Sequence, residues 1–305
     1  MSKLNVFVGP DPRPQMEAAV RDGGGTVVGD PAVADAIVWR GDPQQLAPLL
    51  SERVRWVQLP SAGVERWLAS GLMDADPQRV WTSATGAYSG IVAEHALALL
   101  LAGFRRLPQS ARAATWDHTV SGRTLRGATV AIVGAGGIGR ALIAMLQPFG
   151  AHVLAVTRRG EPVPGADETL PASRVAEVWP RADAVVLAAP ATGATQQLVD
   201  RAVLAALPTD AWIVNVGRGS LIDTDALVHA LAAEQIGGAA LDVTDPEPLP
   251  DDHPLWHEPR ALITPHSANP IGPRSAALAD RVRDNVARRI AGDELLGVVE
   301  RERGY

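Results

Sequence analysis

Residues 129–159 restrict the possible folds more strongly than any other part of this sequence. A short apolar run at 130–133 is typical of a buried strand, and an apolar pattern with helical period follows at 138–149. A second apolar run at 152–157 has the length of another strand. Between the first strand and the helix lie three glycines at G-x-G-x-x-G spacing, Gly134, Gly136 and Gly139. This order predicts a βαβ unit that binds a dinucleotide.

Each glycine of this turn has a separate physical role. Gly134 permits a sharp turn out of the strand, and the missing Cβ of Gly136 permits close approach of a pyrophosphate, while Gly139 permits close packing of the helix on the strand. The N–H groups at the start of the helix, around Gly137 and Ile138, favour a bound anion. An ordinary tight turn is the alternative, but the flanking strands favour a cofactor loop.

Composition and charge exclude several other classes of protein. The chain has 305 residues, of which 47% are apolar, so it is long enough for two domains with substantial cores. A net charge of −6 without a basic block argues against nucleic acid as a partner, and no apolar run is long enough to span a membrane. The sequence has no cysteine, no metal-binding motif and no signal-peptide pattern. We therefore expect a cytoplasmic protein without a bound metal.

Short apolar runs alternate with helical patterns along most of the chain. Such alternation predicts parallel sheets with helices on both faces. Further strands are expected at 4–8, 36–39, 54–59, 80–83, 184–189, 211–216, 238–243 and 262–263. Further helices are expected at 16–21, 44–50, 64–70, 200–207, 225–235 (ended by Gly237) and 273–290.

The expected fold class is α/β, with two doubly wound parallel sheets. A Rossmann dinucleotide-binding domain, residues 89–273, is inserted into a flavodoxin-like substrate domain made of residues 1–88 and 274–305. The run at 90–106 is apolar nearly all round, which predicts a buried helix. Within it, Glu94 would need a partner, and we interpret His95 as a packed or hydrogen-bonded core histidine.

Three side chains with catalytic potential lie just beyond predicted strands of the second domain, namely Arg218, Glu247 and His266. Parallel strands present their carboxyl ends together, so we expect these residues on the edge that carries the glycine turn. A protonated histidine can supply a proton during hydride transfer to a ketone, and a carboxylate can stabilise the imidazolium. An arginine can bind a carboxylate and polarise the adjacent carbonyl. A loop salt bridge or a helix cap is the alternative for each residue alone, but the three together predict a reaction site.

These motifs resemble the D-isomer-specific 2-hydroxyacid dehydrogenase family over nearly the whole chain. The resemblance is carried by GAGGIG, NVGRGSLID, ALDVTDPEPLP and TPH, which occur in the family's order. It implies that Arg218, Glu247 and His266 are the family's catalytic arginine, glutamate and histidine. It also implies a homodimer, a cleft between the two domains, and a small 2-keto or 2-hydroxy acid as substrate. Glyoxylate and hydroxypyruvate are the first candidates.

The resemblance also assigns residues around the reaction site. Ala62 and Gly63 match the backbone loop that binds the substrate carboxylate, with a simple turn as the alternative. Asp242 matches the residue that contacts the nicotinamide carboxamide, with a turn cap as the alternative, and Ser89 matches a hinge position where the family often has Thr. The remaining candidates are Pro190 and Val216 for the cofactor, and Tyr88 and Trp116 for the pocket wall unless they serve only in packing.

The end of the second strand of the βαβ unit indicates which dinucleotide binds. An acidic residue there would hold the ribose 2′-hydroxyl of NAD, but the sequence has Thr157, Arg158 and Arg159. Guanidinium groups attract a 2′-phosphate and can bind it with two hydrogen bonds. We therefore expect NADP(H) to be preferred, with NAD(H) still an option. A solvated surface arginine is the alternative interpretation.

Two other functions fit the same motifs. A dinucleotide-sensing binding protein, such as the co-repressors that share this fold, can retain the same catalytic residues. A dehydrogenase of a larger or phosphorylated acid would need a second basic cluster, and none is apparent in the first domain, although the sequence does not place Arg55, Arg66 and Arg79. Glu247 argues against formate, because related formate dehydrogenases carry Gln there. The short C-terminus leaves no room for the regulatory domain of many phosphoglycerate dehydrogenases.

Overall fold

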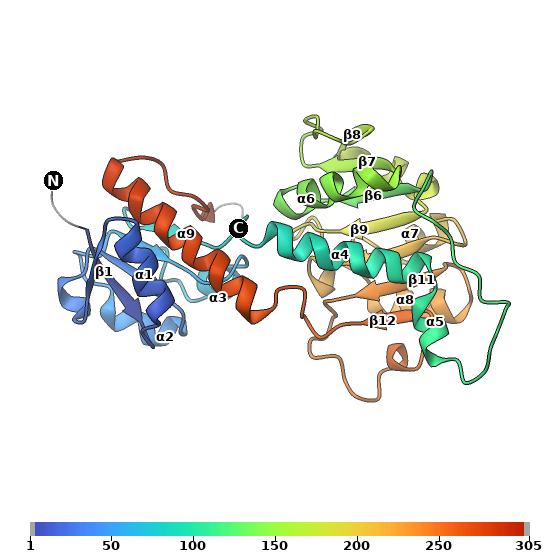
Figure 1. The fold of residues 1–305 in the computed structure, drawn as a ribbon, viewed down its shortest axis with the longest axis horizontal. Helices are drawn as coiled ribbons and strands as arrows, with labels where there is room; N and C mark the ends of the chain where they lie inside the picture. The colour runs from blue at the N-terminus through green and yellow to red at the C-terminus, as the bar shows by residue number, and fades with distance from the viewer. Residues whose placement is uncertain (1–3, 302–305) are drawn as a thin grey trace. The chain divides into compact units, whose positions relative to one another are not determined.

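The computed structural model describes residues 4–301, which form two compact units (Figure 1). The first unit contains the chain up to Tyr88 and again from Pro270, and the second is Ser89–Asn269. The second boundary lies at 269/270 rather than at the 273/274 division drawn from the sequence, because the last helix begins at Ile271. Each unit is a parallel sheet with helices on its faces, so the predicted fold class is confirmed.

The first unit contains a five-stranded parallel sheet in the order β2-β1-β3-β4-β5, which is the flavodoxin-like strand order. Its strands are β1 Asn5–Gly9, β2 Thr26–Val28, β3 Ala36–Trp39, β4 Trp56–Gln58 and β5 Val80–Thr82. Its helices are α1 Pro14–Asp22, α2 Pro43–Leu46, α3 Glu65–Ala69 and α9 Ile271–Ala291. The sequence patterns missed β2, because this edge strand has 3 residues and none of them is fully buried.

The second unit contains a seven-stranded parallel sheet in the order β12-β11-β10-β9-β6-β7-β8. Its strands are β6 Thr129–Val133, β7 His152–Thr157, β8 Glu168–Pro171, β9 Ala184–Leu187, β10 Trp212–Asn215, β11 Gly238–Leu241 and β12 Ala261–Ile263. Its helices are α4 Ser89–Phe104, α5 Leu107–Arg112, α6 Gly137–Leu146, α7 Arg201–Ala206 and α8 Thr224–Ala232. The order reverses between β6 and β9, which is the switch point at which Rossmann folds bind dinucleotides.

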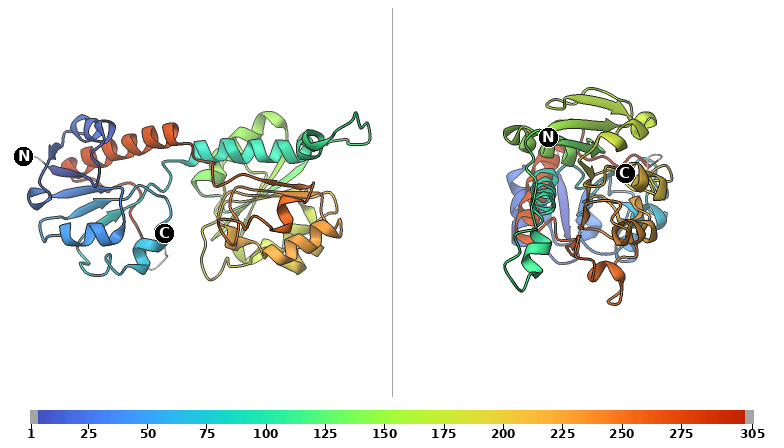
Figure 2. Two further views of the ribbon diagram at one scale, coloured as in Figure 1. Left: turned by 90° about the horizontal axis from the view of Figure 1, so that it is seen from below. Right: turned by 90° about the vertical axis from the view of Figure 1, so that its right-hand side faces the viewer.

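Helices cover both faces of the seven-stranded sheet. Helices α4 and α6 lie on one face, and α7 and α8 lie on the other (Figure 2). Two helix ends differ from the sequence patterns. Helix α6 ends at Leu146, and a short 3₁₀ helix follows at Gln147–Phe149. Gly150 ends this 3₁₀ helix in a left-handed conformation with a φ of 66°. Helix α8 ends at Ala232 rather than at Gln235, because Glu234 adopts a left-handed conformation with a φ of 56°.

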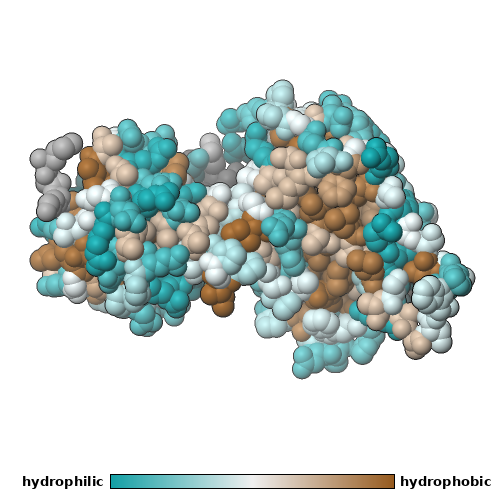
Figure 3. Space-filling model, in the orientation of Figure 1, coloured by the Kyte–Doolittle hydropathy of each residue, from teal (hydrophilic) through white to brown (hydrophobic). Residues whose placement is uncertain are grey.

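Within the described residues, helix α4 is buried on one side only. Its inner side packs against α6, β10 and β11, and Gly103 lies so close to the Trp212 ring that a Cβ would collide with it. Glu94 is exposed and needs no buried partner. Leu97 and Leu101 are only half-buried within the unit. Figure 3 shows hydrophobic surface on this side of the second unit. Among residues 4–301, no helix combines the length and hydropathy needed to cross a bilayer.

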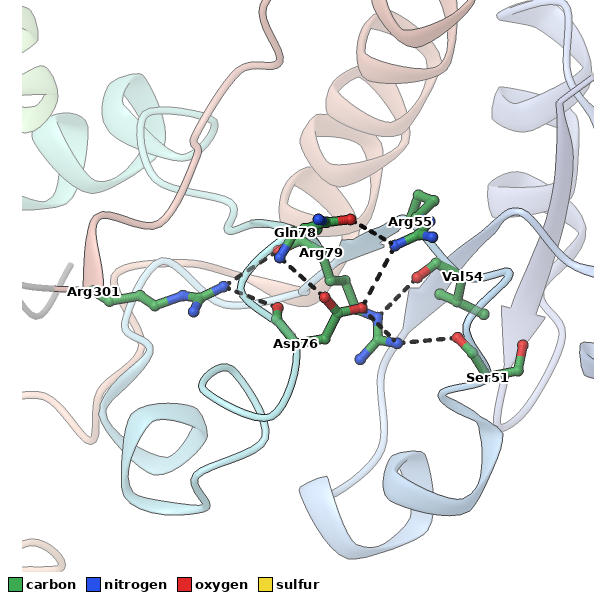
Figure 4. A network of polar contacts seen from close by, with 7 residues as sticks. All are labelled: Ser51, Val54, Arg55, Asp76, Gln78, Arg79 and Arg301. Atoms are coloured by element: carbon green, nitrogen blue, oxygen red, sulfur yellow. Dashed lines mark hydrogen bonds and ion pairs between the residues drawn. The ribbon is translucent and has the colours of Figure 1, made fainter.

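The amino edge of the five-stranded sheet is fixed by a buried arginine (Figure 4). Arg79, which is 5% exposed, donates from Nε to the Val54 carbonyl at 2.8 Å and from Nη2 to the Ser51 carbonyl at 3.0 Å. Its Nη2 also lies 3.4 Å from Asp76, which Arg55 approaches at 3.9 Å. Burial lowers the pKa of the Arg79 guanidinium, and Asp76 opposes that shift. These contacts give both arginines a structural role.

Replacement of Arg79 by alanine is expected to lower the free energy of unfolding by about 2–3 kcal/mol, because two backbone carbonyls lose their charged donor and Asp76 loses its shorter ion pair. Arg55→Ala serves as the matched control, since Arg55 is exposed and its ion pair is long. We expect it to cost less than about 1 kcal/mol. Urea unfolding followed by circular dichroism measures both changes. Equal losses in the two variants would contradict a special role for Arg79.

Candidate active site

The carboxyl ends of the central strands of the second unit lie in register. Val133 pairs with Leu187, Leu187 with Asn215, Asn215 with Leu241, and Leu241 with Ile263. The segments that follow these strands therefore start side by side on one edge of the sheet. They carry the glycine turn and the predicted arginine, glutamate and histidine. The register therefore places these segments on the same edge of the sheet, as the sequence predicted.

The glycine turn has the geometry that the three proposed roles require. Gly134 has a φ of 95°, and a Cβ there would lie 2.5 Å from the backbone nitrogen of Ala189. A Cβ on Gly139 would lie 2.8 Å from the Gly134 carbonyl oxygen, so glycine permits the close approach of α6 to β6. A Cβ on Gly136 would meet no atom within 4 Å. The turn therefore leaves open space just before the first residues of α6, Gly137 and Ile138.

This open space fits the diphosphate of a dinucleotide. Gly136 and Gly137 are exposed, and the first N–H groups of a helix favour a negatively charged group. Pro190 is exposed at the end of the β9 segment, where its carbonyl accepts a hydrogen bond from Thr195 Oγ1 at 2.7 Å. Val216 is 7% exposed directly after β10, and Ser89 is the first residue of α4.

The end of β7 exposes the two arginines that the sequence indicated. Arg158 and Arg159 are both exposed, while the Thr157 hydroxyl accepts a hydrogen bond from the Gly160 N–H at 2.9 Å. Arg159 lies 3.5 Å from Glu161, so one carboxylate is present near this edge after all. Among residues 4–301, Arg158 has no such ion pair, which makes it the better candidate for contact with a cofactor.

His266 and Glu247 form a direct pair. His266 Nδ1 lies 2.7 Å from Glu247 Oε1, and both side chains are about half exposed. The carboxylate thus contacts the ring at Nδ1, so Nε2 is the ring nitrogen left for another partner. The backbone of His266 has a φ of 50°, a left-handed conformation that L-residues rarely adopt. The surrounding hydrogen bonds maintain this strain, since the His266 N–H donates to the Asp242 carbonyl at 2.9 Å.

Asp242 fixes the backbone that carries His266. Its carboxylate is 2% exposed and accepts hydrogen bonds from Thr264 Oγ1 at 2.6 Å and from the N–H groups of Ser267 and Ala268 at 2.8 and 3.1 Å. His95 Nε2 lies 3.3 Å from the same carboxylate. Burial acts to raise the pKa of Asp242, but the hydrogen bonds from these four residues outweigh it and hold the pKa below its usual value. Asp242 is therefore ionised at neutral pH.

His95 is hydrogen-bonded, as the sequence interpretation favoured. Its Nε2 also lies 3.1 Å from the Thr264 hydroxyl, so α4 is joined to the segment that precedes His266. The sequence did not identify Thr264 as a partner of Asp242. Only the TPH motif marked the position, and the pairing depends on β11 and β12 being neighbours.

Arg218 lies on the segment after β10, next to the segment that leads to Glu247. Its Nη1 donates to the Gly217 carbonyl at 2.8 Å, and its own carbonyl accepts from Asn215 Nδ2 at 2.8 Å. The next residue, Gly219, is buried against the carbonyl group of Thr244, where a Cβ would collide. This close backbone contact brings the Arg218 and Glu247 segments together, and the sequence did not reveal it.

The residues predicted in the first unit lie after β4 and β5. The Ala62 and Gly63 carbonyls accept hydrogen bonds from Thr85 Oγ1 at 3.1 Å and Ser61 Oγ at 2.7 Å, which fixes this turn. Tyr88 is 6% exposed, and its hydroxyl donates to the Pro60 carbonyl at 2.6 Å. Burial raises the pKa of Tyr88, while the positive charges of nearby arginines oppose the rise. In the second unit, Trp116 is 86% exposed.

Comparisons with known proteins agree with this architecture. The family model of the D-isomer specific 2-hydroxyacid dehydrogenase NAD-binding domain matches residues 96–268. An uncharacterised protein from Corynebacterium melassecola is 39% identical over 293 residues, which span 94% of this chain and 95% of that protein.

Two solved structures give the same result over the whole chain. A D-isomer specific 2-hydroxyacid dehydrogenase from Xanthobacter autotrophicus Py2, in complex with NADPH and MES, is 28% identical with a TM-score of 0.85 and covers 100% of both chains. An NADPH-dependent glyoxylate/hydroxypyruvate reductase from Sinorhizobium meliloti, in complex with NADP and sulfate, is 25% identical with a TM-score of 0.81 and covers 99% of this chain and 100% of that one.

The family model spans more than half of the chain, and it contains the glycine turn and the segments of Arg218, Glu247 and His266. The resemblance seen in the sequence is therefore confirmed. The chain belongs to the D-isomer-specific 2-hydroxyacid dehydrogenase family, an oxidoreductase family that uses NAD(P).

Proposed function

We propose that this protein is an NADP(H)-preferring reductase of small 2-keto acids, which forms D-2-hydroxyacids or catalyses the reverse reaction. The observation that carries the proposal is the contact of 2.7 Å between His266 Nδ1 and Glu247 on the edge that also bears the glycine turn. An imidazole fixed by a carboxylate is suited to proton transfer, and its position beside a dinucleotide loop suits hydride chemistry. The glyoxylate/hydroxypyruvate reductase of Sinorhizobium meliloti supports these two acids as first candidates.

Each residue has a defined part in the proposed reaction. A dinucleotide held by the glycine turn would supply or accept the hydride. His266 donates a proton to the carbonyl oxygen as charge develops there, and Glu247 stabilises the imidazolium before transfer. Arg218 binds the carboxylate and polarises the carbonyl, because its planar guanidinium offers parallel donors. The N–H groups of the turn at Ala62 and Gly63 are assigned to a substrate carboxylate, as the family resemblance implies.

Cofactor binding is assigned to the glycine turn, and cofactor choice to the end of β7. Gly134, Gly136, Gly137, Ile138 and Gly139 would hold the diphosphate, with Asp242, Pro190, Val216 and Ser89 around the nicotinamide end and Thr157 at the ribose. The exposed Arg158 guanidinium would bind the 2′-phosphate that distinguishes NADP from NAD. The structure from Xanthobacter autotrophicus Py2, in complex with NADPH, supports this choice.

A panel of 2-keto acids, run with NADPH and with NADH, tests the proposal. We expect turnover of glyoxylate or hydroxypyruvate and a lower Michaelis constant for NADPH than for NADH. Arg158→Ala should raise the Michaelis constant for NADPH by about tenfold and leave that for NADH nearly unchanged, since one charge-assisted contact is lost. Arg126→Ala is the control, because Arg126 lies beside Gly150 at the opposite end of β7 from Arg158. Tight cofactor binding without turnover of any keto acid would indicate a dinucleotide-sensing protein instead.

We also propose that the enzyme is a cytoplasmic homodimer, as the family resemblance implies. The half-exposed leucines of α4, Leu97 and Leu101, together with Leu107 at 53% exposure and Trp116 at 86% exposure, give the second unit an apolar surface. Such surfaces mark sites of protein contact. Sedimentation velocity measures the oligomeric state directly.

A further inference from the structure

Three arginines that are far apart in the sequence gather in the first unit at the carboxyl edge of its sheet. Arg40 directly follows β3, and its N–H donates to the carbonyl of Gly9, the last residue of β1, at 2.9 Å. Arg13 follows β1 as the N-cap residue of α1, and Arg274 lies in the first turn of α9. No second basic cluster was apparent in this domain from the sequence, and the fold corrects that expectation.

The packing of α1 on α9 explains how Arg274 reaches this edge. A Cβ on Gly23, just after α1, would lie 2.5 Å from the Arg283 carbonyl oxygen and 2.8 Å from Val286 Cβ. The end of α1 thus lies beside the later turns of α9. A parallel arrangement of the two helices places Arg13 near Arg274, which agrees with the charges of both arginines acting on Arg40. The N-termini of α1 and α9 therefore meet at the end of the sheet where Arg40 lies.

Neighbouring carboxylates offset the three positive charges only in small part. Burial lowers the pKa of Arg40, and the charges of Arg13 and Arg274 lower it further, while Tyr88 and Asp11 oppose the shift with smaller effects. Arg40 Nε is buried without a hydrogen-bond partner. Within residues 4–301, none of the three arginines is in an ion pair. By contrast, three arginines elsewhere in this unit are paired, namely Arg53 with Asp35 at 3.0 Å, Arg66 with Asp42 at 3.0 Å and Arg55 with Asp76 at 3.9 Å.

This arrangement is electrostatically unfavourable unless an anion is present. Like charges repel most strongly where water is partly excluded, and Arg40 is partly buried. Arg13 and Arg274 also lie at helix N-termini, where the helix dipole favours negative groups and disfavours cations. One bound carboxylate or phosphate would relieve both effects, because arginine forks and helix N–H groups all donate to anionic oxygens.

The arginine cluster lies next to the turn that is proposed to bind the substrate carboxylate. β3 carries Arg40, and its neighbour β4 leads to Ala62 and Gly63, so the two segments start about one strand spacing, ~4.8 Å, apart. Tyr88 lies between the arginine cluster and this turn. Its hydroxyl donates to the Pro60 carbonyl at 2.6 Å, and the charges of Arg274 and Arg40 act on its pKa. A second anionic group a few bonds from the first would therefore reach the cluster.

We propose that Arg13, Arg40 and Arg274 bind a second anionic group of the substrate, so that the enzyme prefers short dianionic 2-keto acids to monoanionic ones. The second group is a carboxylate or a phosphate on the side chain of the acid. This inference rests on the proposed function and narrows its substrate class. The turn at Ala62 and Gly63 binds the carboxylate shared by all 2-keto acids, and the arginine cluster selects among their side chains.

Two matched pairs of substrates test the inference. Oxaloacetate differs from pyruvate by one carboxylate, and phosphohydroxypyruvate differs from hydroxypyruvate by one phosphate. With NADPH, we expect kcat/KM for the dianionic member of at least one pair to exceed that for its monoanionic partner by at least about tenfold. The pair with the larger ratio identifies carboxylate or phosphate. Arg40→Gln and Arg274→Gln should each reduce that ratio by at least about tenfold. Arg55→Gln removes a charge from the opposite edge of the same sheet and should leave both pairs unchanged.

The outcomes separate failure of the inference from failure of the proposed function. The proposed role of the arginine cluster would be refuted if the enzyme turned over both pairs with kcat/KM ratios near one. It would also be refuted if these ratios were unchanged in folded Arg40→Gln and Arg274→Gln variants. Neither result would contradict the proposed reductase activity. Absence of turnover for every acid would overturn the reductase. In that case, calorimetric titration with oxaloacetate and phosphohydroxypyruvate tests the inference. Binding to the original protein that is lost in Arg40→Gln would support it, and absence of binding would refute it. Thermal unfolding midpoints establish that each variant is folded.

Discussion

Replacement of His266 by alanine is expected to lower kcat by at least about 10², while the dinucleotide still binds. The imidazole is fixed by Glu247 through Nδ1 at 2.7 Å, so its loss removes the only proposed proton donor and leaves the carboxylate without its partner. The glycine turn lies on a different segment, between β6 and α6, and does not depend on this side chain. Steady-state kinetics with the best keto acid measures kcat, and fluorescence titration with NADPH measures cofactor affinity.

The backbone at His266 determines the choice of control. Its φ of 50° suits asparagine better than alanine, because asparagine tolerates the left-handed region. His266→Asn should therefore keep the local fold and still lose at least about 10² in kcat. Glu247→Gln keeps an oxygen for the ring N–H but removes the charge, and we expect a smaller loss of about tenfold. If His266→Asn retained normal turnover, His266 would have no part in the reaction.

Local patterns in the sequence were sufficient for the fold and for part of the site. Glycine spacing between a strand and a helix predicted the turn at Gly134, since a φ of 95° and close contact with Ala189 exclude other residues. The three catalytic candidates were predicted because each lies beyond the end of a predicted strand, and parallel strands end on one edge. The contact between His266 and Glu247 then depends on only two neighbouring strands, β11 and β12.

Features that depend on packing between distant segments were not predicted. Helix α4 appeared apolar all round, but the sequence pattern does not say which side meets the rest of the unit, and Glu94 proved to be exposed. The arginine cluster combines Arg13 before α1, Arg40 after β3 and Arg274 in α9, and the packing of α1 on α9 brings Arg274 to the other two. Glu161 beside Arg159 was also missed, because it lies beyond the strand end where an acidic residue was sought.

Replacement of Gly219 by alanine is expected to be the most damaging small change in the second unit. Gly219 follows Arg218 and is buried against the backbone of Thr244, on the segment that leads to Glu247. A methyl group cannot fit there, because both the carbonyl of Thr244 and the N–H of Asp245 occupy its place. We expect the free energy of unfolding to fall by about 3 kcal/mol, since one of the two backbone segments must move.

The same displacement should reduce activity beyond the loss of stability. Arg218 and Glu247 lie on the two segments that would separate, so their positions relative to a bound substrate would shift, and we expect kcat/KM to fall by at least about tenfold in the folded fraction. Gly193→Ala is the matched control, because a Cβ there would meet no atom within 4 Å. It should change stability by less than about 0.5 kcal/mol. Urea unfolding and steady-state kinetics of both variants measure these effects, and a fully active, stable Gly219→Ala protein would show that the two segments do not need this contact.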